Sequence, residues 1–174
     1  MVPDSFIPYF TGAATAAGAL VGLLFIAVSL RPEAVMGAGT QLRAVAGSAF
    51  TALVNSFFVS LIALIPGTNL GYTAVLMALV SLYNTYRLHR TLGYGESTVL
   101  LLALSLAAYL TQLVAGILLI ASPGLHSMVY TLAYVLVGAF AAALGRAWTL
   151  AQGGNAPETP GKTHGRHASQ PQEI

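Results

Sequence analysis

IPYFTGAATAAGALVGLLFIAVSL (residues 7–30) is a long apolar run that contains no charged side chain. A helix needs about 20 apolar residues to cross the hydrocarbon core of a bilayer, which is about 30 Å thick. Backbone polar groups cannot remain unsatisfied in lipid, so this run is predicted to be a membrane-spanning helix. No basic segment precedes it and it exceeds the length of a signal-peptide core, so we expect it to be retained.

Four further apolar segments follow, at about residues 44–65, 70–88, 98–121 and 128–150. Hydrophobic residues make up 56% of the chain and charged residues only 7%, whereas soluble domains carry about 25% charged residues. Lipid must therefore cover much of the surface. We predict an all-α, polytopic membrane protein in which residues 1–152 form a bundle of five transmembrane helices. Residues 153–174, which are rich in Gly and Pro, are expected to be a disordered tail.

The basic residues predict how the bundle is oriented. The predicted connections at 66–69 and 122–127 contain no Lys or Arg, and the other ends of the spans carry every basic residue: Arg31, Arg43, Arg87, Arg90, Arg146, Lys162 and Arg166. The positive-inside rule then places the N-terminus outside and the C-terminus in the cytoplasm. The preference for Arg over Lys and the abundance of Ala, Gly and Leu indicate a bacterial protein, so we expect a multi-pass protein of the bacterial inner membrane.

Small residues recur along one face of the first span. Ala14, Gly18 and Gly22 stand four residues apart, and the last two form a GxxxG motif. Small residues let helix backbones approach closely in lipid. Two interpretations remain open: packing within one bundle, or a seam with a second copy or with another membrane protein.

Polar residues lie near the middle of the second and fourth spans. They are Thr51, Asn55, Tyr109 and Gln112. A carboxamide that faces lipid costs several kcal/mol, so these side chains are expected to point inward. They form either interhelical hydrogen bonds or the lining of a pathway for a small uncharged solute or an ion. We expect no ionisable side chain to be buried in a span, which argues against pumps and proton-coupled carriers.

Three arginines lie near the cytoplasmic ends of spans, close to aromatic residues. Arg87 and Arg90 follow the third span, and Arg146 precedes Trp148 in the fifth. Such residues bind anionic lipid headgroups. A specific lipid-binding protein is therefore a third hypothesis. The basic residues are too sparse for a nucleic-acid interface.

The sequence contains no pattern typical of catalysis. There is no cysteine, and the few carboxylates and histidines are scattered, so we predict no catalytic residue, metal site or cofactor. The leading hypothesis is a non-enzymatic membrane protein that acts through helix packing, as an oligomer or as an accessory subunit of a membrane complex.

The first two spans resemble a group of small bacterial multi-span proteins. In that group a Phe-rich start leads through small residues into a Gly-Leu-Leu-Phe-Val-Ala-x-Ser-Leu block, which corresponds here to Gly22–Leu30. Arg43-Ala44 and Pro66 match an Arg-Ala pair and a Pro near the end of the second span. Tyr9 stands where a second Phe is usual, and Ile26 where Val is usual. Some members carry the label of modulators of the membrane protease FtsH, and the resemblance implies no catalytic or ligand residues.

Overall fold

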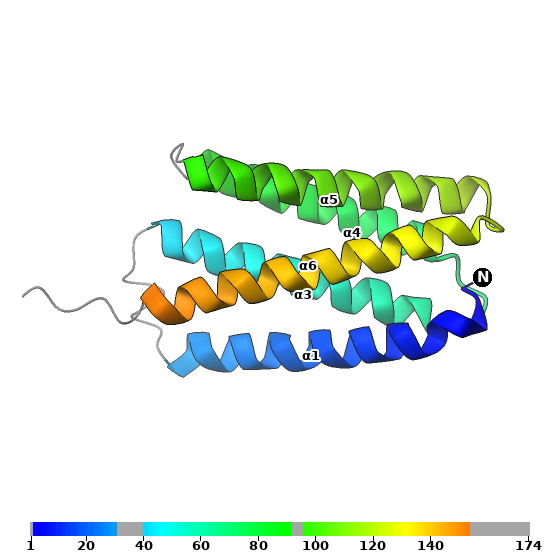
Figure 1. The fold of residues 1–174 in the computed structure, drawn as a ribbon, viewed down its shortest axis with the longest axis horizontal. Coiled ribbons are helices and arrows are strands. Elements are labelled where there is room, and N and C mark those ends of the chain that lie inside the picture. Colours follow the sequence, from blue (N-terminus) through cyan, green and yellow to red (C-terminus); the bar gives the residue numbers. More distant parts are fainter. Residues whose placement is uncertain (1, 31–39, 92–95, 154–174) are drawn as a thin grey trace, which may run out of the picture.

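The computed structural model describes residues 2–30, 40–91 and 96–153, which are almost entirely helical. A 3₁₀ turn at Asp4–Phe6 leads into a series of long helices. They are α1 (Ile7–Leu30), α3 (Thr40–Ala63), α4 (Leu70–Thr91), α5 (Glu96–Ala121) and α6 (His126–Gly153). Successive helices run in opposite directions along one common axis (Figure 1).

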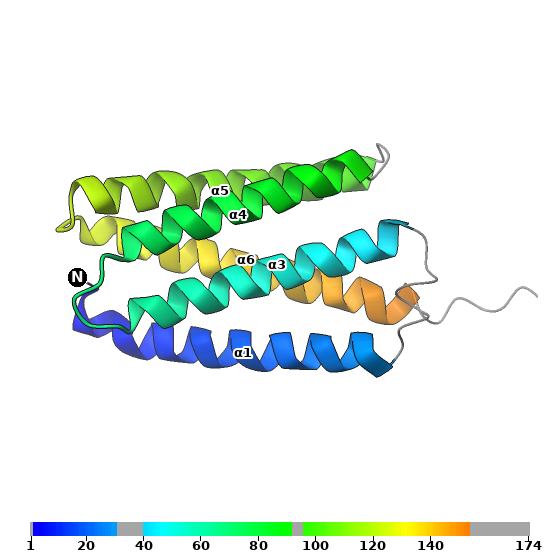
Figure 2. The ribbon, with the colours of Figure 1, turned by 180° about the vertical axis from the view of Figure 1, so that it is seen from behind.

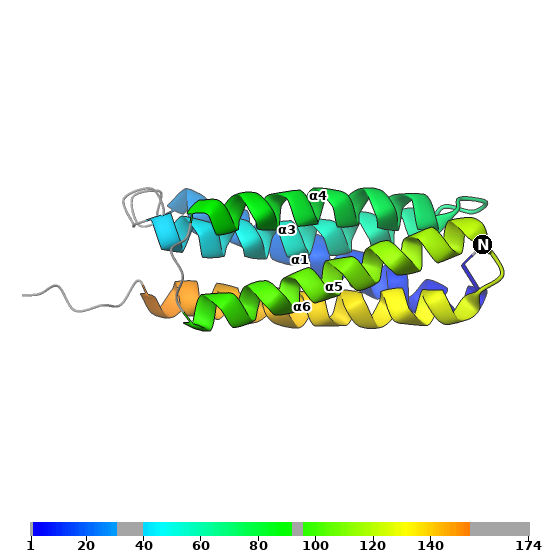
Figure 3. The ribbon, with the colours of Figure 1, turned by 90° about the horizontal axis from the view of Figure 1, so that it is seen from above.

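Four of these helices form a ring around a shared interior. Helix α3 packs on α4 and α6, and α5 packs on α4 and α6. Helix α1 lies outside this ring and packs against α3 (Figure 2). Viewed from above, α5 runs obliquely between the α4 side and the α6 side of the molecule (Figure 3). We name the two ends of the bundle by the chain: the N-terminal end, where α1 and α6 begin, and the C-terminal end, where α6 finishes.

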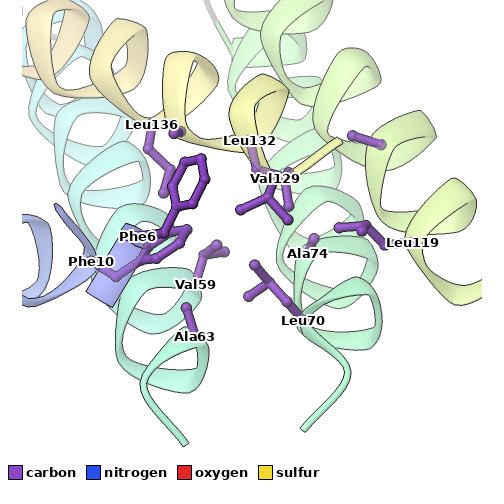
Figure 4. Close-up of a cluster of buried hydrophobic side chains, with 12 residues drawn as sticks. Phe6, Phe10, Val59, Ala63, Leu70, Ala74, Leu119, Val129, Leu132 and Leu136 are labelled. Carbon is purple, nitrogen blue, oxygen red and sulfur yellow. The ribbon is translucent and has the colours of Figure 1, made fainter. Parts of the chain in front are cut away.

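Large apolar side chains fill the N-terminal end of the bundle. Phe6 and Phe10 insert between α3 and α6 and belong to one buried cluster with side chains from α4 and α5 (Figure 4). The ring of Phe6 stacks edge-on against Tyr130, and the Tyr9 hydroxyl donates a hydrogen bond to the Ala133 carbonyl over 2.7 Å. The N-terminal segment is thereby fixed to α6. The other members of this cluster are Val59, Ala63, Leu70, Ala74, Ala115, Leu119, Val129, Leu132, Ala133 and Leu136.

The connection between α3 and α4 shows why both helices stop where they do. Pro66 lacks the backbone N–H that would continue α3, and Gly67 adopts a left-handed φ of 79° that favours glycine. The Thr68 hydroxyl donates to the Ile62 and Ile65 carbonyls, which satisfies two backbone acceptors near the end of α3. The Asn69 side-chain oxygen accepts from the Gly71 N–H and so caps the start of α4.

The predicted all-α fold is confirmed, whereas the predicted count of five spans is not. Four segments of the described chain are long and apolar enough to cross a membrane: Asp4–Ile26, Ala46–Ala63, Leu102–Ala121 and His126–Arg146. Helix α4 is not among them. The first predicted span matches α1, whereas α3 begins earlier than predicted and α4 and α6 end later. The predicted tail lies outside the described residues after Gly153.

Candidate functional site

One face of α5 carries polar side chains into the interior of the helix ring. Ser105, Tyr109 and Gln112 follow the i, i+4, i+7 spacing that places residues on one side of a helix. Tyr109 and Gln112 are buried, and Ser105 is half-buried. These three side chains form two polar groups, one near the middle of the bundle and one toward its C-terminal end.

The central group is a closed pair of carboxamides. Asn55 on α3 donates to the Gln112 side-chain oxygen over 2.8 Å, and Gln112 donates back to the Asn55 oxygen over 2.9 Å. Gln112 also donates to the Ala74 carbonyl on α4 over 3.2 Å. Both side chains are 0% exposed. Hydrogen bonds therefore join three helices at one level of the bundle. This level borders the apolar cluster, because Ala74 belongs to that cluster.

The second group surrounds Arg146, and its position corrects two predictions. Arg146 is only 8% exposed, and its guanidinium donates a hydrogen bond to the Ser105 hydroxyl on α5. It also interacts electrostatically with the Tyr109 phenol. The expectation that no ionisable side chain is buried in a span is therefore wrong. So is the expectation that Arg146 reaches lipid headgroups, because its side chain turns between helices instead of toward the surface.

The Ser81 hydroxyl on α4 completes this second group. It is fully buried beside the Tyr109 phenol, close enough for a weak hydrogen bond but outside normal hydrogen-bond geometry. Ser60 on α3 is also fully buried, and its hydroxyl makes no hydrogen bond with the described residues. A buried hydroxyl without a hydrogen bond costs about 1–3 kcal/mol. Sequence reasoning missed Ser81, although it lies seven residues after Ala74 and thus on the same face of α4.

The remaining predicted residues lie apart from these groups. Thr51 donates to the Gly47 carbonyl one turn earlier on its own helix and does not join the Asn55–Gln112 pair. Arg87 and Arg90 are exposed near the end of α4. The Arg90 guanidinium lies over the Tyr86 ring, 5.5 Å from its centre. This position is compatible with the predicted headgroup contacts of these two arginines.

The residues of the predicted small-residue face of α1 do not all point the same way: some face the bundle and one faces outward. Ala14 is buried, and a Cβ on Gly18 would stand 3.4 Å from the Phe57 ring on α3. Gly22 is exposed, and a Cβ added there would have no atom within 4 Å. Ala14 and Gly18 therefore serve packing inside the chain, and Gly22 does not.

Among the glycines, Gly71 and Gly116 mark the closest approach of two helices, and sequence reasoning missed both. A Cβ on Gly71 of α4 would stand 2.6 Å from the Gly116 carbonyl oxygen on α5. A Cβ on Gly116 would stand 3.0 Å from both the Gly71 carbonyl oxygen and the Val75 nitrogen. Glycine inside a helix costs about 1 kcal/mol relative to alanine. A single glycine inside an apolar helix, such as Gly116, is therefore the sequence feature that could have indicated this close contact.

The chemistry that this interior offers is hydrogen bonding. Among residues 2–30, 40–91 and 96–153, no group of three or more His, Asp and Glu side chains is arranged to hold a metal ion. No protein-family model, no curated protein and no solved structure matches this chain. The resemblance of the first two spans to the bacterial multi-span group therefore stays a prediction.

Proposed function

We propose that this chain is a non-enzymatic, multi-pass protein of the bacterial inner membrane that acts by associating with a second copy or with another membrane protein through the outer face of α1. The supporting observation is a contrast between exposed surfaces. From Thr11 to Gly22 the outer face of α1 carries only small side chains: Thr11, Gly12, Thr15, Ala16, Ala19 and Gly22.

The other helices present large side chains on their exposed faces. On α5 these are Leu104, Leu106, Leu110, Val114, Ile117 and Leu118. Such residues are typical of a surface that lipid chains cover. A smooth helix face instead lets another helix backbone approach closely, and dispersion forces then favour helix association over lipid contact.

Helix α4 is included as a fifth span in this proposal. Its 22 residues extend about 33 Å at 1.5 Å per residue, enough for the hydrocarbon core. It lies between α3 and α5, and its exposed side chains are Tyr72, Leu76, Leu79, Val80, Tyr83 and Tyr86. Exposed Tyr72, Tyr130 and Tyr134 lie toward one end of the bundle, and Tyr83, Tyr86 and Trp148 toward the other. Aromatic residues favour the two membrane interfaces.

The solute-pathway alternative is less consistent with the geometry. The Asn55 and Gln112 carboxamides bind each other, and apolar side chains occupy the bundle interior on the N-terminal side of this pair. A continuous polar lining through the whole bundle is therefore lacking within the described residues.

The test is extraction of the full chain from native membranes into nanodiscs, with complex mass and co-purifying proteins measured together. The variant is Ala16→Leu with Ala19→Leu, which fills the smooth face without adding charge. Its matched control is Ala103→Leu with Ala107→Leu, at exposed positions on α5. We expect the α1 variant to lose the associated copy or partner and the control to retain it. A wild-type chain that is monomeric without partners, or an α1 variant with unchanged association, would contradict the proposal.

A further inference from the structure

We propose that the exposed face of α4 near its C-terminal end is a binding site for one anionic phospholipid, in which Arg90, held against the Tyr86 ring, contacts the lipid phosphate. This inference rests on the part of the proposed function that places α4 in the bilayer. It does not depend on association through α1.

The first argument is that this face is open to a ligand along its whole length. Helix α4 runs along one edge of the bundle (Figure 3). Its exposed positions stand three or four residues apart, as one side of a helix requires. Leu76 is 61% exposed, Tyr83 65% and Tyr86 58%. In the C-terminal part of α4 the exposed residues are Leu76, Leu79, Val80, Tyr83, Tyr86, Arg87 and Arg90.

The second argument is the order of side-chain types on this face. Aliphatic residues come first, Tyr83 and Tyr86 follow, and Arg90 stands at the end. A phospholipid has the same order of acyl chain, interfacial region and charged headgroup. From Leu76 to Arg90 the helix rises about 21 Å, which is close to one leaflet with its headgroup layer, about 20–22 Å thick. The aliphatic part of the face favours a lipid over a soluble anion.

The third argument is the geometry of Arg90. Its guanidinium lies over the Tyr86 ring, 5.5 Å from the ring centre, within the range of about 6 Å for a cation–π contact. Stacking uses the flat face of the guanidinium, whereas its N–H donors lie in the plane and match phosphate oxygens. A side chain that is already held by a ring loses less rotamer freedom when it binds a ligand. Arg90 is therefore preorganised for a phosphate.

The fourth argument is the charge at this end of α4. The helix contains no Asp or Glu, and its last turns carry Arg87 and Arg90. Glu96 begins α5, so the stretch from residue 87 to residue 96 keeps a net positive charge. An anionic headgroup complements this charge. A choline headgroup does so less well, because its own cation offsets the phosphate.

The experiment uses the full chain in nanodiscs that contain equal amounts of phosphatidylcholine and phosphatidylglycerol. Native mass spectrometry then counts the lipids that stay bound to the released protein. We expect the wild-type chain to retain one phosphatidylglycerol in preference to phosphatidylcholine. Arg90→Gln should lower this preference about tenfold, because a charge-assisted hydrogen bond to the phosphate is lost.

Two matched controls make the assignment specific. Arg43→Gln removes the same charge near the start of α3, at the same end of the bundle, and should keep the preference. Tyr86→Leu should weaken the preference, whereas Tyr72→Leu, at the other end of the same exposed face, should keep it. Equal losses in Arg90→Gln and Arg43→Gln would show a general attraction between surface charges and lipid, and would overturn the site. An unchanged preference in Arg90→Gln or Tyr86→Leu would overturn it as well.

Failure of the lipid site can be separated from failure of the proposed fifth span. Labelling of the two chain ends in intact cells shows whether the number of crossings is odd or even. With five crossings, a wild-type chain without phosphatidylglycerol preference would refute the lipid site alone. With four, α4 as a span and the lipid site would both be refuted. Loss of a co-purifying protein in Arg90→Gln, without any lipid preference in the wild type, would assign this face to a protein partner instead.

Discussion

At the scale of single residues, the Asn55–Gln112 pair shows how two buried carboxamides satisfy each other inside a helix bundle. Each side chain has one acceptor and one donor group, so two of them close a ring with two hydrogen bonds. Gln112 uses its remaining N–H for the Ala74 carbonyl. The sequence was sufficient to predict that both side chains point inward. It could not show the bond to Ala74, because that acceptor is backbone and has no signal in a side-chain pattern.

The pair predicts a strong coupling between two substitutions. Gln112→Leu should destabilise the bundle by about 1–3 kcal/mol, because the Asn55 carboxamide would remain buried without partners. The double variant Asn55→Leu with Gln112→Leu should cost less than the sum of the two single variants. The measurement is reversible unfolding in mixed micelles, analysed as a double-mutant cycle. Additive effects would show that the two carboxamides do not stabilise each other.

Arg146 marks the limit of residue-level prediction. Its position near the end of an apolar run and two residues before Trp148 is typical of a headgroup anchor. The decisive property is the direction in which the side chain leaves α6, and that direction depends on how α6 is rotated against α5. Helix rotation is set by packing with neighbouring helices, which a pattern in one segment does not contain.

At the scale of helices, the close approach of α4 and α5 depends on two glycines from different segments. The GxxxG motif of α1 is visible in the sequence because both of its glycines lie in one segment. Gly71 and Gly116 nevertheless make a closer helix contact than either glycine of that motif. Each is the single glycine of its helix, and only the tertiary structure brings the two together. Helix bounds were predicted more accurately than these contacts. The errors lie at helix ends, because hydrophobicity marks only the apolar segment, whereas α3 begins and α4 ends with polar residues beyond that segment.

The close contact between α4 and α5 predicts that one added methyl group at Gly116 lowers the stability of the bundle. In Gly116→Ala the new Cβ would stand 2.9 Å from the Val75 Cγ2 and 3.0 Å from two backbone atoms, so α4 and α5 must move apart. We expect a loss of about 1–3 kcal/mol from overpacking. Gly138→Ala on α6 is the control, because no atom lies within 4 Å of that Cβ position. It should be neutral or slightly stabilising. Unfolding in mixed micelles compares the two, and equal stability would show that the helices are not in this close contact.

At the scale of the whole molecule, the two halves of the bundle differ in chemistry. Aromatic and aliphatic side chains fill the N-terminal end. The carboxamide pair lies near the middle, and the Arg146–Ser105 hydrogen bond lies toward the C-terminal end. The proposed orientation would place the polar half in the cytoplasmic leaflet. That assignment rests on the distribution of Lys and Arg, because a helix bundle alone does not indicate which end faces the cytoplasm.

The proposed topology can be tested with single cysteines, because the natural chain contains none. Ser5 and Ser122 are exposed at the N-terminal end of the bundle, and Ser169 lies in the predicted cytoplasmic tail. In intact cells, a membrane-impermeant maleimide should label Ser5→Cys and Ser122→Cys, and it should label Ser169→Cys only after permeabilisation. Because five crossings place the two termini on opposite sides and four place them on the same side, labelling of both Ser5→Cys and Ser169→Cys in intact cells would exclude α4 as a fifth span. Labelling of Ser169→Cys alone would instead reverse the orientation and place Arg146 in the outer leaflet.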